Sequence, residues 1–256
     1  YLFMQNFLGF ALKGVINMNI ICDKSKLLEG INISLKAIPG KSTMAILECM
    51  VIEAKDGIIK LISNDLEIGI ETIIEGEIKE PGSVAVNAKV FFEIIRKLPY
   101  NEVTISVNEN LTMNITCGKA KFNIPVKDTE EFPYLPKIVK DKSVLISQFT
   151  LKEAIRQTIF SISPNDSNKM MTGELFEVKD NELKVVSLDG HRMSIRKIIL
   201  KEHYNDIKVI VPGKTLGEIS KILNGDNESE VQIFFSSNHI MFDFDSTLVV
   251  SRLIEG

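Results

Sequence analysis

The sequence has few residues of the types that build metal, redox or disulfide sites. Its three cysteines are odd in number, lie far apart and form no CxxC pair. This pattern argues against a disulfide framework and favours a reducing compartment. The three histidines also lack metal-ligand spacing, so the sequence predicts neither a metal site nor a cofactor. These residues are Cys22, Cys49 and Cys117, with His191, His203 and His239.

Signals for nucleotide binding and for membrane insertion are missing as well. The sequence contains no P-loop, no GxGxxG and no run of 18 apolar residues. Residues 1–17 are apolar but lack the basic start and the cleavage site of a signal peptide. We interpret them as an N-terminal extension ahead of Met18, and we predict a cytoplasmic protein without a membrane partner.

Neither charge sign is in large excess. The 30 basic and 34 acidic residues give a formal net charge of −4, which excludes a simple polycation that coats nucleic acid. A protein with one basic surface is still compatible with this balance, because net charge does not describe its distribution. With 256 residues, of which 45% are hydrophobic, the chain can bury one large core or two of ordinary size.

An internal repeat organises the chain. At a shift of 124 residues, segment 53–65 (EAKDGIIKLISND) falls on segment 177–189 (EVKDNELKVVSLD), with six of 13 positions identical. At a shift of 125, segment 84–99 falls on segment 209–224, with six of 16 positions identical. Matching blocks in the same order indicate two copies of one domain.

Each copy shows the same pattern of apolar residues. Spacings of three and four predict two helices per copy, and short β-rich runs predict antiparallel strands, the last two of which close the copy. Asp56-Gly57 and Asp180-Asn181 have turn chemistry and predict a hairpin in each copy. The fold class is therefore α+β, a tandem repeat of a domain with two helices packed on antiparallel sheet. The expected helices span 25–38, 88–98, 151–162 and 214–223, and the expected closing strands span 103–107, 111–117, 231–235 and 239–244.

The segment 128–143 (DTEEFPYLPKIVKDKS) has two prolines, acidic residues and no periodicity, which predicts a connection between domains. We accordingly divide the chain into four parts. They are the N-terminal extension (1–17), the first domain (18–135), the linker (136–142) and the second domain (143–256).

Four segments resemble the β subunit of bacterial DNA polymerase III, the sliding-clamp family. They are ISNDLEIGIE (62–71), VFFEIIRKLP (90–99), CGKAKFNIPVKDTEEFPYLP (117–136) and, most specifically, LDGHRMS (188–194). The family implies a non-enzymatic processivity factor that encircles duplex DNA and tethers the replicative polymerase, the clamp loader and repair proteins. Its subunits have three such domains and close as a homodimer ring, so a third clamp domain is absent from this chain.

A clamp must hold DNA without reading its sequence, which requires a diffuse positive lining that faces the phosphates. The repeat matches Lys89 with Lys214 and Arg96 with Lys221 on the second helices. The resemblance adds Lys41, and it adds Lys169 in a loop of the second domain. The DNA-facing candidates are therefore Lys41, Lys89, Arg96, Lys169, Lys214 and Lys221. The alternative is that they are ordinary solvated lysines and arginines.

The resemblance also implies a partner-peptide cleft lined by Met171, Gly190, His191, Arg192 and Met193. This cleft would bind peptides of the pattern Q-x-x-L-x-F, and methionines suit a pocket that adapts to many peptides. A hairpin turn with Met193 in the core is the simpler alternative. The segment QNFLGF (5–10) itself matches the partner pattern. It is either a docking peptide or part of a vestigial extension.

An enzymatic interpretation of the same loop has little support. Ser187, Asp189 and His191 are close in sequence, but no G-x-S-x-G elbow is present and this spacing does not reproduce a triad. No other polar cluster has the spacing of acid-base or metal chemistry. The remaining rivals are a peptide-binding module without DNA contact and a metabolic enzyme built from a duplicated domain.

Overall fold

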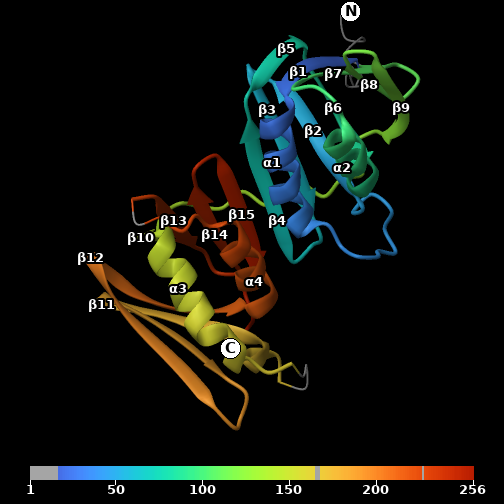
Figure 1. Cartoon of the computed structure of the whole chain (residues 1–256). Coiled ribbons are helices and arrows are strands. Elements are labelled where there is room, and N and C mark those ends of the chain that lie inside the picture. The colour runs from blue at the N-terminus through green and yellow to red at the C-terminus, as the bar shows by residue number, and fades with distance from the viewer. Residues whose placement is uncertain (1–16, 165–167, 227) are drawn as a thin grey trace, which may run out of the picture.

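The computed structural model describes residues 17–164, 168–226 and 228–256, and its elements form two similar series (Figure 1). The first series consists of β1 (Met18–Asp23), α1 (Lys24–Ser34), η1 (Leu35–Ala37), β2 (Cys49–Lys55), β3 (Ile58–Asn64), β4 (Ile68–Ile74), β5 (Gly76–Glu80), β6 (Gly82–Asn87), α2 (Ala88–Lys97), β7 (Glu102–Asn108), β8 (Thr112–Cys117) and β9 (Ala120–Lys127). The second consists of β10 (Ser143–Ser147), α3 (Gln148–Thr158), η2 (Ile159–Ser161), η3 (Lys169–Thr172), β11 (Gly173–Leu188), β12 (Met193–Pro212), α4 (Gly213–Ile222), β13 (Glu230–Phe235), β14 (His239–Phe244) and β15 (Thr247–Arg252). The α+β class predicted from the sequence is confirmed.

Three of the four α-helices, α1, α2 and α3, begin at a polar side chain that caps them. The Asp23 carboxylate accepts the backbone N–H groups of Ser25 (2.8 Å) and Lys26 (3.3 Å) at the start of α1. Ser147 caps α3 in the same way, through Thr150 N at 3.2 Å. The predicted helices 25–38 and 151–162 are each an α-helix followed by a short 3₁₀ turn. In the described ranges, no helix is long and apolar enough to cross a membrane.

The two predicted hairpin turns are both present, although the strand labels differ between them. Asp56 (φ 51°) and Gly57 (φ 79°) form the expected turn between β2 and β3, because both positions need a left-handed backbone. Asp180 is also left-handed (φ 54°), and the strand register shifts on both sides of it. The strand label β11 continues through Asp180, but Lys184 Nζ lies 2.6 Å from Glu177 Oε2. Seven residues of straight strand would hold these two residues about 23 Å apart, so the chain folds back at Asp180 as the sequence predicted.

The predicted closing strands are present as β7 with β8 and β13 with β14. The expectation of only two such strands per copy is wrong, because a third strand follows in each, β9 and β15. β15 does not only complete its own copy. It pairs antiparallel with β4 of the first copy, from Thr247 opposite Thr72 to Ser251 opposite Ile68.

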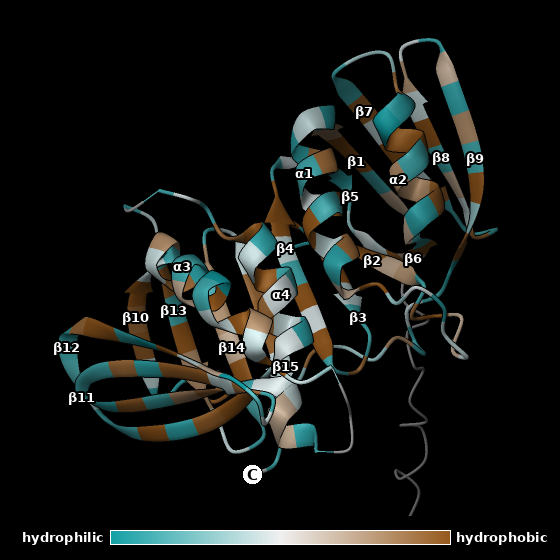
Figure 2. Cartoon of the chain, turned by 60° about the horizontal axis from the view of Figure 1, so that its bottom comes forward, coloured by the Kyte–Doolittle hydropathy of each residue, from teal (hydrophilic) through white to brown (hydrophobic). Residues whose placement is uncertain are grey.

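This ladder joins the two copies into one 13-stranded antiparallel sheet. The hydroxyls of Thr72 and Thr247 lie 2.8 Å apart inside it. Ile68 and Ile70 of β4 belong to the hydrophobic core of the second copy rather than the first. Figures 1 and 2 show all four α-helices on one side of this sheet. The joint therefore buries apolar side chains and satisfies two strand edges at once.

The connection between the copies is packed against the sheet. Phe132 is buried and its ring meets Tyr134 edge-on at 5.5 Å. Asn64 Nδ2 donates to Pro133 O at 2.6 Å, and Leu135 lies so close over Gly69 that a Cβ there would be 1.8 Å from its Cδ2. Since β10 begins at Ser143, we retain 136–142 as the proposed linker, with docked residues immediately before it.

Candidate functional site

Lys41 and Lys89 are brought together in the first domain. Lys89 is the second residue of α2, and its Nζ donates to Gly40 O at 3.0 Å, which places it beside the loop that carries Lys41. Both side chains are exposed, as is Lys169 on η3. Within the described part of the chain, none of these three lysines forms an ion pair. They are the candidates whose charge is available to a ligand.

Arg96 and Lys221 are matched by the repeat and have the same environment. Each pairs at 2.7 Å with a glutamate three residues earlier on its own helix, Glu93 for Arg96 and Glu218 for Lys221. Such exposed pairs contribute little to stability, but they reduce the positive field that a phosphate would meet. These two residues are therefore weaker DNA-facing candidates than Lys41, Lys89 and Lys169.

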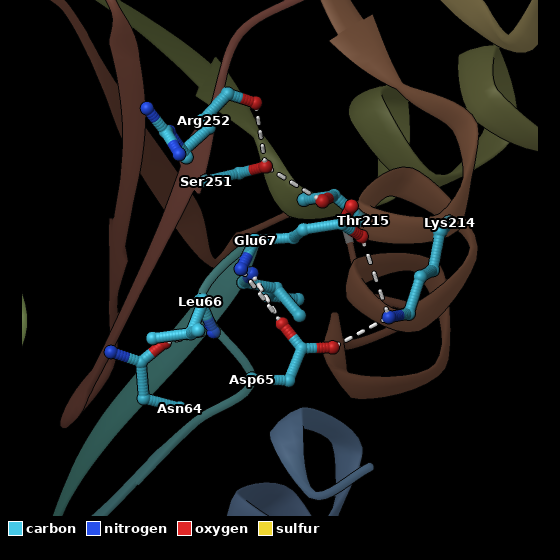
Figure 3. A network of polar contacts seen from close by, with 9 residues as sticks. Asn64, Asp65, Leu66, Glu67, Lys214, Thr215, Ser251 and Arg252 are labelled. Atoms are coloured by element: carbon cyan, nitrogen blue, oxygen red, sulfur yellow. Dashed lines mark hydrogen bonds and ion pairs between the residues drawn. The ribbon is translucent and has the colours of Figure 1, made fainter. Parts of the chain in front are cut away.

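Lys214 spans the joint between the domains (Figure 3). Its Nζ lies 2.5 Å from Asp65 Oδ2 and 3.7 Å from Glu67 Oε2. Asp65 Oδ1 accepts the backbone N–H groups of Glu67 (3.0 Å) and Ile68 (2.8 Å), so this carboxylate is held in place. Burial is the largest single influence on the pKa of Lys214 and lowers it, but the hydrogen bonds and charges of Asp65 and Glu67 together outweigh burial and raise the pKa. Lys89 and Lys214 occupy matched positions, yet Lys214 has an acidic partner across the joint.

We expect the Lys214–Asp65 pair to stabilise the joint by about 0.5–1 kcal/mol, since the lysine is half exposed and solvent weakens the attraction. Urea unfolding of Lys214→Met, Asp65→Asn and the double variant would measure this coupling. The matched control is Arg192→Met with Asp189→Asn, in the corresponding turn of the second domain. A coupling of zero at Asp65 would show that the pair does not stabilise the joint.

An apolar pocket of about 310 Å³ lies on the second domain. Of the five predicted cleft residues only Met171 lines it. The pocket is formed by η3, by the outward face of β11, by the last third of β12 and by the end of the chain. Its lining residues are Asn168, Met170, Met171, Gly173, Leu175, Val186, Leu188, Lys208, Val209, Ile210 and Gly256.

The other four predicted cleft residues form the turn after Leu188. Asp189 Oδ1 accepts the backbone N–H groups of His191 (3.0 Å) and Arg192 (3.1 Å), and its Oδ2 accepts Arg192 Nε at 2.9 Å. Gly190 takes the left-handed backbone of this turn (φ 87°). Met193 is 61% exposed, so the alternative that placed it in the core is wrong. The turn borders the pocket through Leu188, which pairs with Met193.

The loop does not have the geometry of a hydrolase. Ser187 is buried, and its hydroxyl donates to Thr158 O at 2.5 Å, which removes it as a nucleophile. The hydrogen bond from His191 N, first among several, holds the pKa of Asp189 below its usual range. Among the described residues, no group of three His, Cys, Asp or Glu side chains could hold a metal ion.

Sequence reasoning missed most of the pocket. Leu175, Val186 and Leu188 lie outward on β11, while Phe176 and Val185 of the same strand are in the core. A strand that is apolar on both faces was the available signal, because it indicates that its outer face is also covered or hollow. The predicted docking segment 5–10 lies outside the described residues.

Fold and site together define a protein of tandem α+β domains, joined edge to edge through one antiparallel sheet, with an apolar pocket on the second domain. Two family models match it. The DNA polymerase III beta subunit N-terminal domain matches residues 18–136, and the central domain of the same subunit matches residues 145–256. The chain belongs to the DNA polymerase III beta-subunit family, as the sequence resemblance indicated.

Individual relatives agree with this assignment. A beta sliding clamp of Staphylococcus epidermidis is 36% identical over 247 residues, which are 93% of this chain and 65% of that relative. A crystal structure from Eubacterium rectale, of a protein assigned to the DNA polymerase III beta subunits, is 57% identical with a TM-score of 0.92, over 93% of this chain and 66% of that one. The DNA polymerase sliding clamp of Bacillus subtilis is 33% identical with a TM-score of 0.91, over 94% of this chain and 65% of that one. The chain thus spans about 65% of the length of its curated relatives.

Proposed function

We propose that this chain is part of a DNA sliding clamp, the non-catalytic processivity factor of a replicative DNA polymerase, and that it works in the cytoplasm. In this function the protein encircles duplex DNA without reading its sequence and tethers the polymerase, the clamp loader and repair proteins through a peptide cleft. The observation that carries the proposal is the joint between β15 and β4, because it adds one domain to the next through a continuous sheet.

Each strand of the joint corresponds, by the repeat, to a strand of the other copy whose outer edge is exposed. By the repeat, β9 corresponds to β15, and Phe122 of β9 is 40% exposed while Val249 of β15 is fully buried. The first third of β12 corresponds to β4, and its Met193 and Ile195 are at least half exposed. In the described part of the chain, the start of β9 pairs only with β8 and residues 193–199 of β12 pair only with β11. Two such edges support a head-to-tail ring, completed as a homodimer if each subunit has a third domain.

The helices on one side of the sheet are the proposed DNA-facing surface. Phosphates need mobile, weakly bound cations there, since tight or base-specific contacts would stop sliding. Lys41, Lys89 and Lys169 fit this role best, because their charges are not paired among the described residues. We keep Arg96, Lys214 and Lys221 as secondary members, whose field is reduced by Glu93, Asp65 and Glu218.

The pocket around Met171 and Leu188 is the proposed site for partner peptides of the pattern Q-x-x-L-x-F. Its apolar lining suits the Leu and Phe side chains, and the turn of Gly190, His191, Arg192 and Met193 provides an exposed rim. Burial of two large apolar side chains is worth roughly 3–6 kcal/mol before ordering costs. The family completes this cleft with residues of the third domain, so we expect the present chain to bind such peptides weakly.

Titration of one labelled Q-x-x-L-x-F peptide tests this site. We expect the version extended by a third domain to bind more tightly than the present chain. Met171→Asp in the extended version should weaken binding by roughly 10–100-fold, because a charge replaces a buried apolar contact. Met193→Asp at the rim should have a smaller effect.

Val139→Asp is the matched control, since Val139 is 63% exposed and lies on the linker away from the pocket lining. Equal affinity of both lengths would mean that the pocket lies entirely within residues 143–256. If neither Met171→Asp nor Met193→Asp changes peptide binding by the extended version, the peptide binds elsewhere and the assignment is refuted.

A further inference from the structure

A carboxyl group lies buried behind the pocket. Glu174 is 0% exposed and stands on β11 between Gly173 and Leu175, both of which line the pocket. Because side chains alternate along a strand, Glu174 points to the other face, toward the end of α3. Its Oε1 lies 2.9 Å from Thr158 Oγ1, and its Oε2 has no hydrogen-bond partner among the described residues.

The hydrogen bonds around Thr158 indicate which form of Glu174 is present. Thr158 Oγ1 lies 2.8 Å from Ala154 O as well as 2.9 Å from Glu174 Oε1, and a hydroxyl has only one proton to donate. A protonated Glu174 donates from Oε1 to Thr158, which then donates to Ala154 O, and only the uncharged Oε2 is left without a partner. An ionised Glu174 would keep only the hydrogen bond from Thr158 to Oε1, and its charged Oε2 would lie in the core without a hydrogen-bond donor, which is costly. Burial accordingly raises the pKa of Glu174 to about 7.

No neighbouring charge offsets this burial. Within the described residues, the only interaction that opposes the effect of burial on the pKa of Glu174 is the hydrogen bond with Thr158. The charged groups on the surrounding elements are exposed or engaged elsewhere. They are Lys152, Glu153 and Arg156 on α3, Lys169 on η3, Glu177, Lys179, Asp180, Glu182 and Lys184 on β11, Arg196, Lys197, Lys201, Glu202, His203, Asp206 and Lys208 on β12, and Lys214, Glu218 and Lys221 on α4.

The contact with Thr158 closes a loop that carries part of the pocket. Thr158 is the last residue of α3 and Glu174 is the second residue of β11, and the segment between them contains Met170 and Met171. The carbonyl of Thr158 also accepts the Ser187 hydroxyl at 2.5 Å, so the same helix end is tied to a second position on β11. Loss of the Glu174 contact would therefore release one of two ties between α3 and the pocket wall.

We propose that protonated Glu174 is a positioning residue for the pocket, that it holds the end of α3 against β11, and that loss of its proton loosens the wall formed by Met170, Met171 and Leu175. The inference deepens the proposed function, because it rests on this pocket being the partner-peptide site. The physical cause is that a carboxylate must regain water, and it can do so only if β11 and α3 separate. Peptide affinity should consequently fall as pH rises through 7.

Carbon-13 NMR of the unliganded chain tests this without any peptide. With labelled glutamate carboxyl and methionine methyl groups, we expect the Glu174 carboxyl to titrate near pH 7 and the Met170 and Met171 methyl signals to shift with the same midpoint. The protonated fraction should fall from about 90% at pH 6 to about 10% at pH 8. In Glu174→Gln, which keeps a donor to Thr158 and cannot ionise, both methyl signals should stay at their low-pH positions.

Two further variants separate the causes. Glu177→Gln on the same strand is the matched control and should leave the methyl titration unchanged, because Glu177 pairs with Lys184 at 2.6 Å. Thr158→Val should leave Glu174 titrating but weaken the methyl response, since the tie is gone. A Glu174 carboxyl that titrates below pH 5, or methyl signals that ignore it, would overturn the proposal. If the methyl signals respond but no peptide binds at any pH, the proposed function fails and the positioning role stands.

Discussion

At pH 8, Glu174→Gln is expected to raise the free energy of unfolding by about 3 kcal/mol. The reason is that burial raises the pKa of Glu174 from 4.5 to about 7 in the folded chain. Between these two pH values folding takes up a proton. The stability that Glu174 permits is therefore fully present below about pH 4.5 and is lost as pH rises through 7. Glutamine has no such proton to lose.

Urea unfolding followed by circular dichroism at pH 5 and pH 8 measures this difference. At pH 5 the variant should gain less than about 1 kcal/mol, because Glu174 still holds its proton in the folded state. Glu177→Gln is the control of opposite sign. The hydrogen bond from Lys184 lowers the pKa of Glu177, so its neutralisation should reduce stability at pH 8. A gain for Glu174→Gln that is equal at both pH values would contradict a titrating carboxyl.

Reversal of charge at Lys41, Lys89 and Lys169 is expected to reduce affinity for every duplex DNA tested, whatever its sequence. If each lysine neutralises one phosphate, the triple glutamate variant should lower the slope of log affinity against log salt by about 3. The reduction should be uniform, because phosphates are the same at every base pair. Binding to several unrelated duplexes at a series of salt concentrations measures both quantities.

The matched control reverses three exposed lysines away from the helices, Lys55, Lys137 and Lys179. It changes the net charge by the same amount, so any general effect of charge on DNA affinity appears in both triple variants. The DNA-facing assignment fails if the control loses as much affinity as the test variant. A loss that depends on the DNA sequence would contradict a clamp that slides.

The features predicted best from the sequence depend on residues that are close along the chain. The turn at Asp56-Gly57 needs two left-handed residues in succession, and only a few residue types accept them readily. Asp180, at the matched position of the second copy, follows the same rule. It adopts the expected left-handed backbone, and Lys184 returns to within 2.6 Å of Glu177 across it.

The candidate site was predicted only in part, since most of it is made of long-range contacts. Met171 was identified, but Val186 and Ile210, which line the pocket with it, come from more distant parts of the chain. Lys214 was expected to share the role of Lys89, and its partner Asp65 is 149 residues away. Glu174 is of a residue type that is rarely buried without a charged partner, although it is in phase with Phe176 on β11. Its burial depends on how α3 packs.

By itself the sequence determined the α+β class, the duplication and the register that matches Lys89 with Lys214 and Glu93 with Glu218, because periodicity and self-similarity are written along the chain. The tertiary structure decided how the copies meet, which charges are neutralised and where a pocket opens. Each of these depends on which strand edge finds a partner and which side chain loses water. The free energy of a charged or apolar group depends far more on its burial than on its neighbours in sequence. For this reason only the tertiary structure shows that Asp65 pairs with Lys214 and that burial raises the pKa of Glu174.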